Sequence, residues 1–336
     1  MRTPVSIDKS LFQLASQLIL SVDRILIVSH VRPDGDSLGS LLGLGSALES
    51  IGKKVQMVSE DGVPAKFKYL DGSSRVLTRQ HSPYDVLIIL DCSGLERIGK
   101  TIEEPIRPDI NIDHHITNLN FAKINLVDDE AVATAEIIFK FLKVMNLPIP
   151  PIVADALLTG LITDTLGFRT NNMTPKALRV VAKLMDKGAN LPNLYKLAMV
   201  NRSFEAMRFW GAGLLDLKKA DGLVWTSLTM LDRENAKYSG RDDADLINIL
   251  SSINEAKIAV IFVEQPNGKV KVSWRSQPNY DVAKIALMFG GGGHSSASGA
   301  EIYGNLSDVK SKVLGATRSI LNKENIQSIL KNQRDK

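Results

Sequence analysis

Residues 24–40 read RILIVSHVRPDGDSLGS. The apolar run over residues 25–29 predicts a buried strand, which leads directly to His30 and a short polar loop. Residues 37–51 then carry helical periodicity, and the glycine that follows them is typical of a helix end. A strand, a polar loop and a helix in this order form the first half of a β-α-β unit, and this favours a parallel sheet.

The chain continues with further strand-like and helical segments. Apolar strands are predicted at 54–59, 86–90 and 110–112, and helices at 134–145 and 152–164. The second of these strands is almost wholly aliphatic, as expected where both faces of a parallel sheet are covered. We therefore expect an α/β fold whose N-terminal domain contains a doubly wound, mainly parallel sheet.

The C-terminal part is richer in β-structure. Strands are predicted at 223–230, 258–264 and 269–275, and helices at 282–289 and 307–322. The sequence QPNG at 265–268 predicts a tight hairpin turn, since Asn and Gly both tolerate positive φ. These segments predict a second, smaller α/β domain, with a cleft between the two domains.

The domain boundaries follow from these changes in pattern. The stretch 174–209 is predicted to be wholly helical and to connect the domains. The predicted parts are a catalytic domain over 1–190, a helical connector over 191–212, a substrate-binding domain over 213–325 and a polar tail over 326–336.

The composition excludes several classes of protein. With 336 residues, 23% charged and 44% hydrophobic, the chain is globular rather than disordered. The single Cys92 excludes an intrachain disulfide framework and a cysteine-based zinc site. A net charge of +4 is too small for a protein that coats duplex nucleic acid. No apolar run reaches the ~18 residues of a membrane span and the N-terminus does not resemble a signal peptide, so we expect a cytoplasmic protein without membrane contact.

Acidic and imidazole side chains follow three of the predicted strands. Because the carboxyl ends of parallel strands meet at one edge of a sheet, and ligands bind there, these side chains are expected to lie together. Another carboxylate ends the apolar helix at 152–164. The residues concerned are His30, Asp34, Asp36, Asp91, Asp113, His114, His115 and Asp164.

This set of side chains is typical of a metal centre. Several carboxylates in one place repel each other unless a cation lies among them. Carboxylate oxygens mixed with imidazole suit Mn²⁺ or another first-row divalent ion better than Ca²⁺. Two such ions about 3.5–4 Å apart would bind the attacking and leaving oxygens of a phosphoryl transfer, which predicts hydrolysis of a phosphate ester.

Each of these motifs also has a structural interpretation. The Asp-Gly-Asp sequence at 34–36 is commonly a turn that caps a helix, and a single aspartate after a strand is more often structural than a ligand. Taken together, the motifs favour function, because four of the five histidines fall in the candidate motifs. The exception, His81, lies in a polar loop and is predicted to be on the surface.

The C-terminal part contains a glycine run, 290–293, directly before His294. The run is either a structural turn or a cradle in which backbone amides approach a phosphate. Arg275, at the end of a predicted strand, could bind the same phosphate through its guanidinium group. Arg169, five residues after Asp164, is a surface residue or a second phosphate ligand.

These motifs resemble those of the DHH phosphoesterase superfamily, named for the triplet at 113–115. SHVRPDGDSLGS at 29–40 is close to the family's His-x-x-Pro-Asp-x-Asp-x-x-Gly-Ser pattern, and Asp91, the triplet and TGLITDT at 159–165 follow in the family's order. VSWRS at 272–276 and the glycine-histidine sequence resemble the DHH-associated C-terminal domain. The resemblance covers nearly the whole chain, and within the superfamily it is similar to the oligoribonuclease and pAp phosphatase branch.

The resemblance implies two Mn²⁺ ions, although other divalent ions are possible. One ion would be held by His30, Asp34 and Asp91, and the other by Asp36, Asp91, His114 and Asp164, with Asp91 bridging. His115 would face the substrate phosphate as general acid or electrostatic stabiliser, and Asp113 would orient its neighbours. The implied substrate-binding residues are Arg169, Arg275, Ser276, Gly291, Gly292, Gly293 and His294.

The function implied is an Mn²⁺-dependent exoribonuclease that hydrolyses very short single-stranded RNA to mononucleotides, and pAp to AMP. The family's glycine-histidine motif usually continues with Lys or Arg, whereas SSASG follows here at 295–299, and this leaves the preferred substrate open. The alternatives are a phosphodiesterase for cyclic di-AMP or pApA, a pyrophosphatase or exopolyphosphatase, and a non-catalytic nucleotide-binding regulator. A homodimer is also possible.

Overall fold

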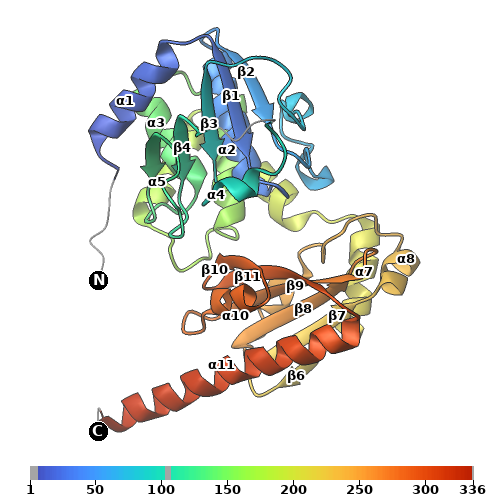
Figure 1. Ribbon diagram of the computed structural model, residues 1–336. Helices are drawn as coiled ribbons and strands as arrows, with labels where there is room; N and C mark the ends of the chain where they lie inside the picture. The colour runs from blue at the N-terminus through green and yellow to red at the C-terminus, as the bar shows by residue number, and fades with distance from the viewer. Residues whose placement is uncertain (1–6, 103–106, 335–336) are drawn as a thin grey trace. The chain divides into compact units, whose positions relative to one another are not determined.

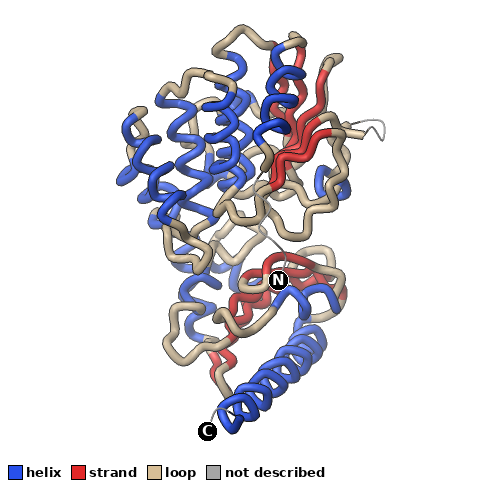
Figure 2. Tube along the Cα trace, turned by 90° about the vertical axis from the view of Figure 1, so that its left-hand side faces the viewer, coloured by secondary structure: helices blue, strands red, loops and turns tan. Residues whose placement is uncertain are grey.

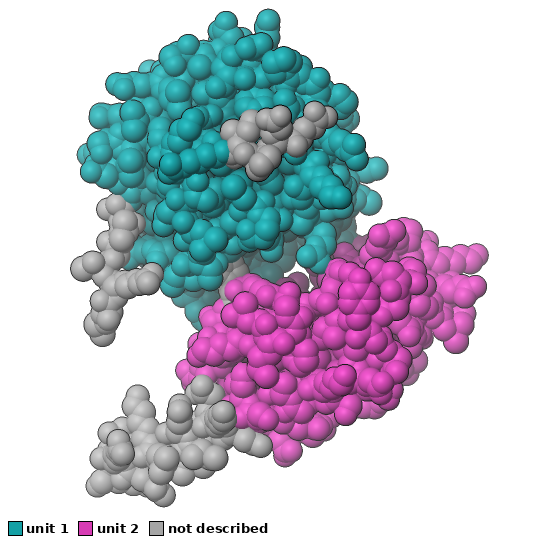
Figure 3. Space-filling model, in the orientation of Figure 1, with its two compact units in different colours: residues 1–201 teal, residues 202–336 magenta. Residues whose placement is uncertain are grey.

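The computed structural model describes residues 7–102 and 107–334, without the side chains of His294 and residues 322–334. The chain folds into two compact units, residues 1–201 and 202–336, coloured separately in Figure 3. Each unit has its own sheet (Figure 1). Within the described ranges, we find no helix with the length and apolarity that a bilayer span requires.

The N-terminal unit is built on a five-stranded parallel sheet with the strand order β2-β1-β3-β4-β5. Its strands are β1 (Arg24–Ser29), β2 (Lys54–Val58), β3 (Val86–Leu90), β4 (Ile110–Asp113) and β5 (Ile124–Val127). Its helices are α1 (Lys9–Leu20), α2 (Gly35–Glu49), α3 (Thr134–Val144), α4 (Pro151–Asp164), α5 (Pro175–Asp186) and α6 (Leu191–Tyr195), with short turns η1 (Ala65–Phe67), η2 (Ser73–Arg75), η3 (Leu95–Ile98) and η4 (Lys196–Val200). The α/β class and the mainly parallel N-terminal sheet are confirmed.

The two faces of this sheet are covered differently. Ile25, Ile27 and Ile88 point from alternate strand positions into one core with α1 to α5. Leu26 and Val28 point to the opposite face, where loop segments and η3 complete a smaller core. Figure 2 shows the helices gathered on one side of the strands. Because both faces are buried, β1 and β3 consist almost wholly of aliphatic residues.

The C-terminal unit contains a six-stranded mixed sheet with the order β10-β11-β9-β8-β7-β6, in which only β7 and β8 are parallel. Its strands are β6 (Lys218–Ala220), β7 (Leu223–Leu228), β8 (Ile258–Glu264), β9 (Lys269–Ser276), β10 (Gly292–His294) and β11 (Ala297–Tyr303). Its helices are α7 (Phe204–Leu215), α8 (Met230–Ala236), α9 (Leu246–Leu250), α10 (Val282–Met288) and α11 (Leu306–Arg334). Helices cover both faces, with Trp274 and Phe262 in the core under α10 and α11 and Phe209 in the core on the other side. The predicted hairpin between β8 and β9 is confirmed.

The prediction of one helical stretch over 174–209 is wrong. The chain leaves the helix after α5, where Gly188 adopts a φ of +99° that ends a helix readily. It turns again before α7, where the side chain of Ser203 accepts a hydrogen bond from the Ala206 amide as an N-cap. The closing helix α11 continues to Arg334, well beyond the predicted end at 322 and into the predicted tail, whose last two residues lie outside the described ranges.

Candidate metal centre

The polar side chains that follow the strands do lie together at the carboxyl edge of the N-terminal sheet. His30 follows β1, Asp91 follows β3, and His114 follows β4. The Nε2 atom of His30 lies 3.4 Å from Oδ2 of Asp91, and Nε2 of His114 lies 3.8 Å from Oδ1 of the same carboxylate. Asp91 is therefore the centre of the cluster, and its φ of +57° places it in the left-handed region, where a non-glycine residue is strained.

The two aspartates of the first loop differ in role. Asp34 is exposed and caps α2, because its Oδ1 accepts hydrogen bonds from the amides of Asp36 and Ser37. Asp36 is 1% exposed and lies in the first turn of α2. The structural interpretation of the Asp-Gly-Asp turn thus applies to Asp34, which caps the helix and also lies 3.9 Å from Nε2 of His30.

Asp164, the last residue of α4, completes the cluster. One of its carboxylate oxygens, Oδ2, lies 3.4 Å from Nε2 of His114. Three sets of donor atoms lie within 4.8 Å of one another in the described residues, and each could hold a cation. The sets are Asp91, His114 and His115; His30, Asp34 and Asp91; and Asp36, His114 and Asp164.

The two buried histidines are oriented as metal ligands require. Nδ1 of His30 lies 2.8 Å from the Val31 carbonyl oxygen, and Nδ1 of His114 lies 3.3 Å from the Ala131 carbonyl oxygen. A proton on each Nδ1 would be donated to these carbonyls, and the lone pair of each Nε2 would then face the carboxylates. This is the tautomer that binds a divalent ion.

The charge of the cluster also fits a cation. Burial, and then the charge of Asp91, raise the pKa of Asp36 well above its usual value. Burial, and then the charges of Asp34 and Asp91, do the same for Asp164. Carboxylates this close repel one another, and a divalent ion among them would supply the balancing positive charge. The oxygen and imidazole donors together suit Mn²⁺ or a similar first-row ion.

We expect Mn²⁺ to raise the thermal unfolding temperature, and to do so more at about pH 7.5 than at about pH 5. Carboxyls with a raised pKa hold more protons in the folded chain, so the metal-free protein loses stability as pH rises above the ordinary pKa of Asp. An ion at about 100 times its Kd would add about 2.7 kcal/mol, or about 5–10 °C. Melting curves with Mn²⁺ and with chelator at both pH values check this; identical temperatures throughout would contradict a metal centre.

A second set of hydrogen bonds surrounds His115. Its Nδ1 lies 2.6 Å from Oδ1 of Asp113, whose other oxygen accepts a hydrogen bond from Nδ2 of Asn118 at 2.6 Å. Burial lowers the pKa of His115, but the bond to Asp113 and the charge of Asp91 outweigh it and raise this pKa to about 10. The Asp113 carboxylate therefore favours the protonated form of His115 and fixes its ring.

The N-terminus of α3 contributes a residue that the sequence analysis missed. The amides of Thr134 and Ala135 donate to the two carboxylate oxygens of Asp36 at 2.6 and 3.0 Å. The hydroxyl of Thr134 donates to Oδ1 of Asp91 at 2.8 Å. Asn118 was missed as well. A threonine at a helix start and an asparagine in a polar loop have ordinary structural uses, so neither carries a recognisable signal.

Replacing Thr134 with Val is expected to weaken metal binding about 10–100-fold, since residues that orient a ligand carboxylate have effects of this size. The backbone amide that holds Asp36 remains, so the loss isolates the hydroxyl contact to Asp91. Thr134→Ser keeps the hydroxyl and should restore affinity. Titration with Mn²⁺ measures this; equal affinity in the Val and Ser variants would contradict the role of the hydroxyl.

In the C-terminal unit, Arg275 and Ser276 end strand β9. The Arg275 side chain is half-buried, and it donates from Nε to Oδ1 of Asn248 and from Nη1 to the Trp274 carbonyl, which fixes its direction. The Ser276 hydroxyl donates to the Tyr280 carbonyl oxygen at 2.5 Å. The hydroxyl therefore holds the following loop in place.

The glycine run is largely required by the fold. A Cβ on Gly291 would lie 2.2 Å from the Gly299 carbonyl oxygen, and Gly293 adopts a φ of +135°. Gly292 differs, because a Cβ there would meet nothing within 4 Å. Gly292 to His294 form β10, paired antiparallel with β11. The side chain of His294 lies outside the described residues.

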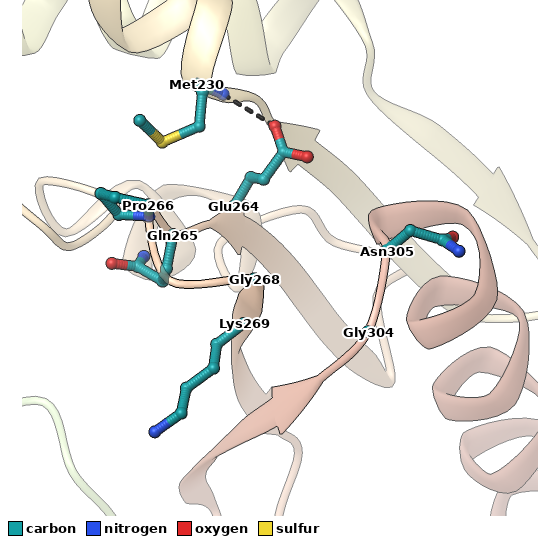
Figure 4. A pocket seen from close by; sticks show the side chains of 8 residues that line it. All are labelled: Met230, Glu264, Gln265, Pro266, Gly268, Lys269, Gly304 and Asn305. Atoms are coloured by element: carbon teal, nitrogen blue, oxygen red, sulfur yellow. Dashed lines mark hydrogen bonds between the residues drawn. The ribbon is translucent and has the colours of Figure 1, made fainter.

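Two other features lie apart from these residues. Arg169 is exposed and donates from Nε to the Leu166 carbonyl oxygen, and nothing described joins it to the metal cluster. An open pocket of about 630 Å³ lies beside the β8–β9 turn, with Glu264 hydrogen-bonded to the Met230 amide and Lys269 at its rim (Figure 4). Arg275 lies six residue steps along β9 from Lys269, about 20 Å, so this pocket is distinct from the predicted nucleotide site.

Comparisons with known proteins agree with the motifs. Residues 24–161 match the DHH family, N-terminal domain, and residues 231–329 match the DHHA1 domain. The bifunctional oligoribonuclease and PAP phosphatase NrnA of Thermus thermophilus is 31% identical, over 92% of this chain and 94% of that protein. The protein of the same name from Mycoplasma genitalium is 28% identical, over 88% and 95%.

Among solved structures, an exopolyphosphatase-related protein from Bacteroides fragilis is similar with a TM-score of 0.86 and 28% identity, over 95% of this chain and 98% of that one. Both domain matches occur in the order that the motifs predict. On these matches and on an identity of 31% along most of its length, the chain belongs to the DHH family of phosphoesterases.

Proposed function

We propose that this protein is a divalent-metal-dependent hydrolase that releases mononucleotides from very short single-stranded RNA and converts pAp to AMP. The observation that carries the proposal is the cluster around Asp91, in which two histidines present Nε2 to buried carboxylates. The similarity to oligoribonuclease and PAP phosphatase relatives along most of the chain supports the substrate class. The cytoplasmic location stays a prediction.

Two Mn²⁺ ions are proposed, with Asp91 shared between them. One would be held by His30, Asp34 and Asp91, and the other by Asp36, Asp91, His114 and Asp164. When bound, divalent ions stabilise negative charge on phosphoryl oxygens and make water more acidic.

The remaining residues of the cluster position groups and move a proton. His115, kept protonated by Asp113, is placed to donate a proton to the leaving oxygen of the substrate or to stabilise its charge. Asn118 holds the other carboxylate oxygen of Asp113, so the imidazole ring keeps one orientation. Thr134 and the α3 amides keep the carboxylates in place in the same way.

The C-terminal unit is proposed to bind the nucleotide. Arg275 is fixed in direction by Asn248 and has further guanidinium donors for a phosphate. The fold does not require glycine at position 292, because a Cβ there would meet nothing within 4 Å. Close approach of a bound ligand to the backbone would explain why Gly292 has no side chain. His294 and Arg169 stay predictions as substrate-binding residues.

Product analysis tests the proposal. Pure protein with Mn²⁺ is incubated in parallel with a labelled RNA trimer, pApA, pAp and pyrophosphate, each with a chelator control. Mononucleotide release from the trimer or pApA, together with AMP from pAp, all lost on chelation, is the expected result. Cleavage of pyrophosphate alone would move the protein to the pyrophosphatase alternative, and nucleotide binding without turnover would favour the regulator.

Replacing His294 with Ala is expected to lower kcat/KM on a dinucleotide about 10–100-fold while a small artificial phosphodiester is hydrolysed as before. The large substrate uses binding interactions away from the scissile phosphate, and the small one does not. Steady-state kinetics on both substrates measure the difference. Equal losses would show that the glycine-histidine loop is only structural.

A further inference from the structure

The loop before α9 contains two successive non-glycine residues in the left-handed region of backbone space. Ala244 has a φ of +53° and Asp245 a φ of +67°, and we name this pair the 244–245 turn. A residue with a Cβ is strained there, and such strain persists only where surrounding contacts hold it. Ala244 is also 5% exposed, so the strained backbone lies inside the C-terminal unit and its contacts can be identified.

Two side chains hold the 244–245 turn. Nε of Arg202 and Nε1 of Trp210 both donate to the Ala244 carbonyl oxygen, at 3.3 and 3.1 Å. Nη2 of Arg202 also donates to Oδ2 of Asp245, at 2.8 Å. The Arg202 side chain is 14% exposed, and its Cζ lies 5.8 Å from the centroid of the Trp210 ring. Because the guanidinium group is planar and has several donors, Arg202 bonds both strained residues at once.

Two hydrogen bonds connect the 244–245 turn to Arg275, the arginine proposed above to bind the nucleotide. The carbonyl oxygen of Asp245 accepts from the Asn248 amide at 3.1 Å, and Oδ1 of Asn248 accepts from Nε of Arg275 at 3.2 Å. Asn248 lies on α9, which has only five residues and is too short to be stable by itself. Leu246 and Leu250 anchor α9 in the core, while the turn fixes its N-terminal end.

We propose that Arg202 is a positioning residue for nucleotide binding. By holding the 244–245 turn, Arg202 sets the place of Asn248 and thereby the direction of the Arg275 guanidinium group. Arg202 itself does not touch the substrate. A donor displaced by about 1 Å can lower activity about 100-fold, so a residue that acts only through Arg275 can still have a large effect. The inference rests on the proposed function, since it concerns the arginine assigned there to the nucleotide.

Steady-state kinetics on pApA and on a small artificial phosphodiester are the first test. Arg202→Ala should raise KM for pApA about 10–100-fold and leave hydrolysis of the small substrate unchanged, because the lost interaction lies away from the scissile phosphate. Arg208→Ala, at an exposed arginine on α7, is the matched control and should behave as wild type. An unchanged KM for pApA in Arg202→Ala overturns the proposal, as do equal losses on both substrates, which indicate a merely structural role.

A second substitution tests whether Arg202 acts through the 244–245 turn. Glycine adopts positive φ without strain, so a turn with Ala244→Gly no longer needs the bonds from Arg202. The double variant Arg202→Ala with Ala244→Gly should therefore bring KM for pApA back to within a few-fold of the wild-type value. If Arg202→Ala raises this KM and the double variant does not lower it again, the route through the turn is wrong.

Trp210→Phe keeps the test valid if Arg202→Ala does not fold. Phenylalanine keeps an aromatic ring beside the guanidinium group of Arg202 and removes the N–H that donates to the Ala244 carbonyl oxygen. KM for pApA should rise several-fold in this variant, and Ala244→Gly should again reverse the rise. A well-folded Trp210→Phe variant with the wild-type KM would contradict the role of these bonds.

Titration calorimetry with pApA in the presence of chelator separates this inference from the proposed function. A wild-type chain that binds pApA, and hydrolyses it once Mn²⁺ is added, supports the proposed function. If Arg202→Ala then binds pApA with equal affinity, only the role of Arg202 is overturned. A wild-type chain that neither binds nor hydrolyses pApA, the RNA trimer or pAp overturns the proposed function, and this inference with it.

Discussion

Replacing Asp91 with Asn is expected to reduce hydrolysis of RNA trimers and pAp by about 1,000-fold or more, since loss of a single electrostatic contact in an active site already costs about 100–1,000-fold. Asp91 is 2% exposed, and His30 and His114 both direct Nε2 to its carboxylate. Although burial opposes ionisation, the hydrogen bond with His30 and the nearby imidazoles lower the pKa of Asp91 below its usual value. The amide of Asn has the same shape without the charge, so both proposed ion sites would lose their shared ligand.

The test measures two quantities on each variant: hydrolytic activity and the rise in unfolding temperature that Mn²⁺ produces. Asp91→Asn should abolish the rise in unfolding temperature that Mn²⁺ produces, while Asp129→Asn, at an exposed aspartate, should change neither quantity. Full activity in the Asp91→Asn variant would contradict the two-metal centre, because both proposed ion sites share this carboxylate.

Replacing His115 with Ala should lower kcat by about 100–10,000-fold, the range expected for loss of a general acid. The imidazole is linked to Asp113 at 2.6 Å, which holds it protonated at neutral pH. The metal ligands proposed here do not include His115, so the stabilisation by Mn²⁺ should persist. His81→Ala, at an exposed histidine, is the control and should behave as wild type.

The position of His115 makes this test discriminating. Its Nδ1 also lies 3.8 Å from Oδ1 of Asp91, which places it in one of the possible donor sets. If His115→Ala removes the stabilisation by Mn²⁺ together with activity, the residue is a metal ligand and the assignment as proton donor is wrong. Unfolding curves and kinetics on the same preparation separate the two roles.

Much of the fold could be predicted from the sequence, for a physical reason. The strands β1 and β3 are buried on both faces and therefore read as uninterrupted aliphatic runs. The short edge strand β5 was not predicted, because an alternation over only four residues, INLV, is too short to distinguish a strand from a loop. One continuous helix was predicted over 174–209, because the apolar periodicity gives no sign of the break before α7, where Ser203 is the N-cap.

The candidate metal centre, too, could be predicted only in part from the sequence. Its carboxylates and imidazoles were predictable because their side chains are uncommon at strand ends and parallel topology brings strand ends together. Thr134 and Asn118 were not, since their contribution depends on which carboxylate their donors reach in the folded chain. Arg275 was predicted, but its hydrogen-bond partner Asn248 was not. Asn248 lies on α9, a helix of five residues that is too short to show a periodic pattern in the sequence.

The hydrogen bonds from α3 to Asp36 join residues 98 and 99 positions apart in the chain. Contacts at such separation are slow to form, since a long loop must close first. Asp164 lies further along still, so the complete set of donors exists only after the chain has been synthesised through α4 and has folded. Ion binding therefore reports on assembly of the N-terminal unit from β1 through α4, and substitutions in the α2–α3–α4 packing should weaken the metal centre without touching a ligand.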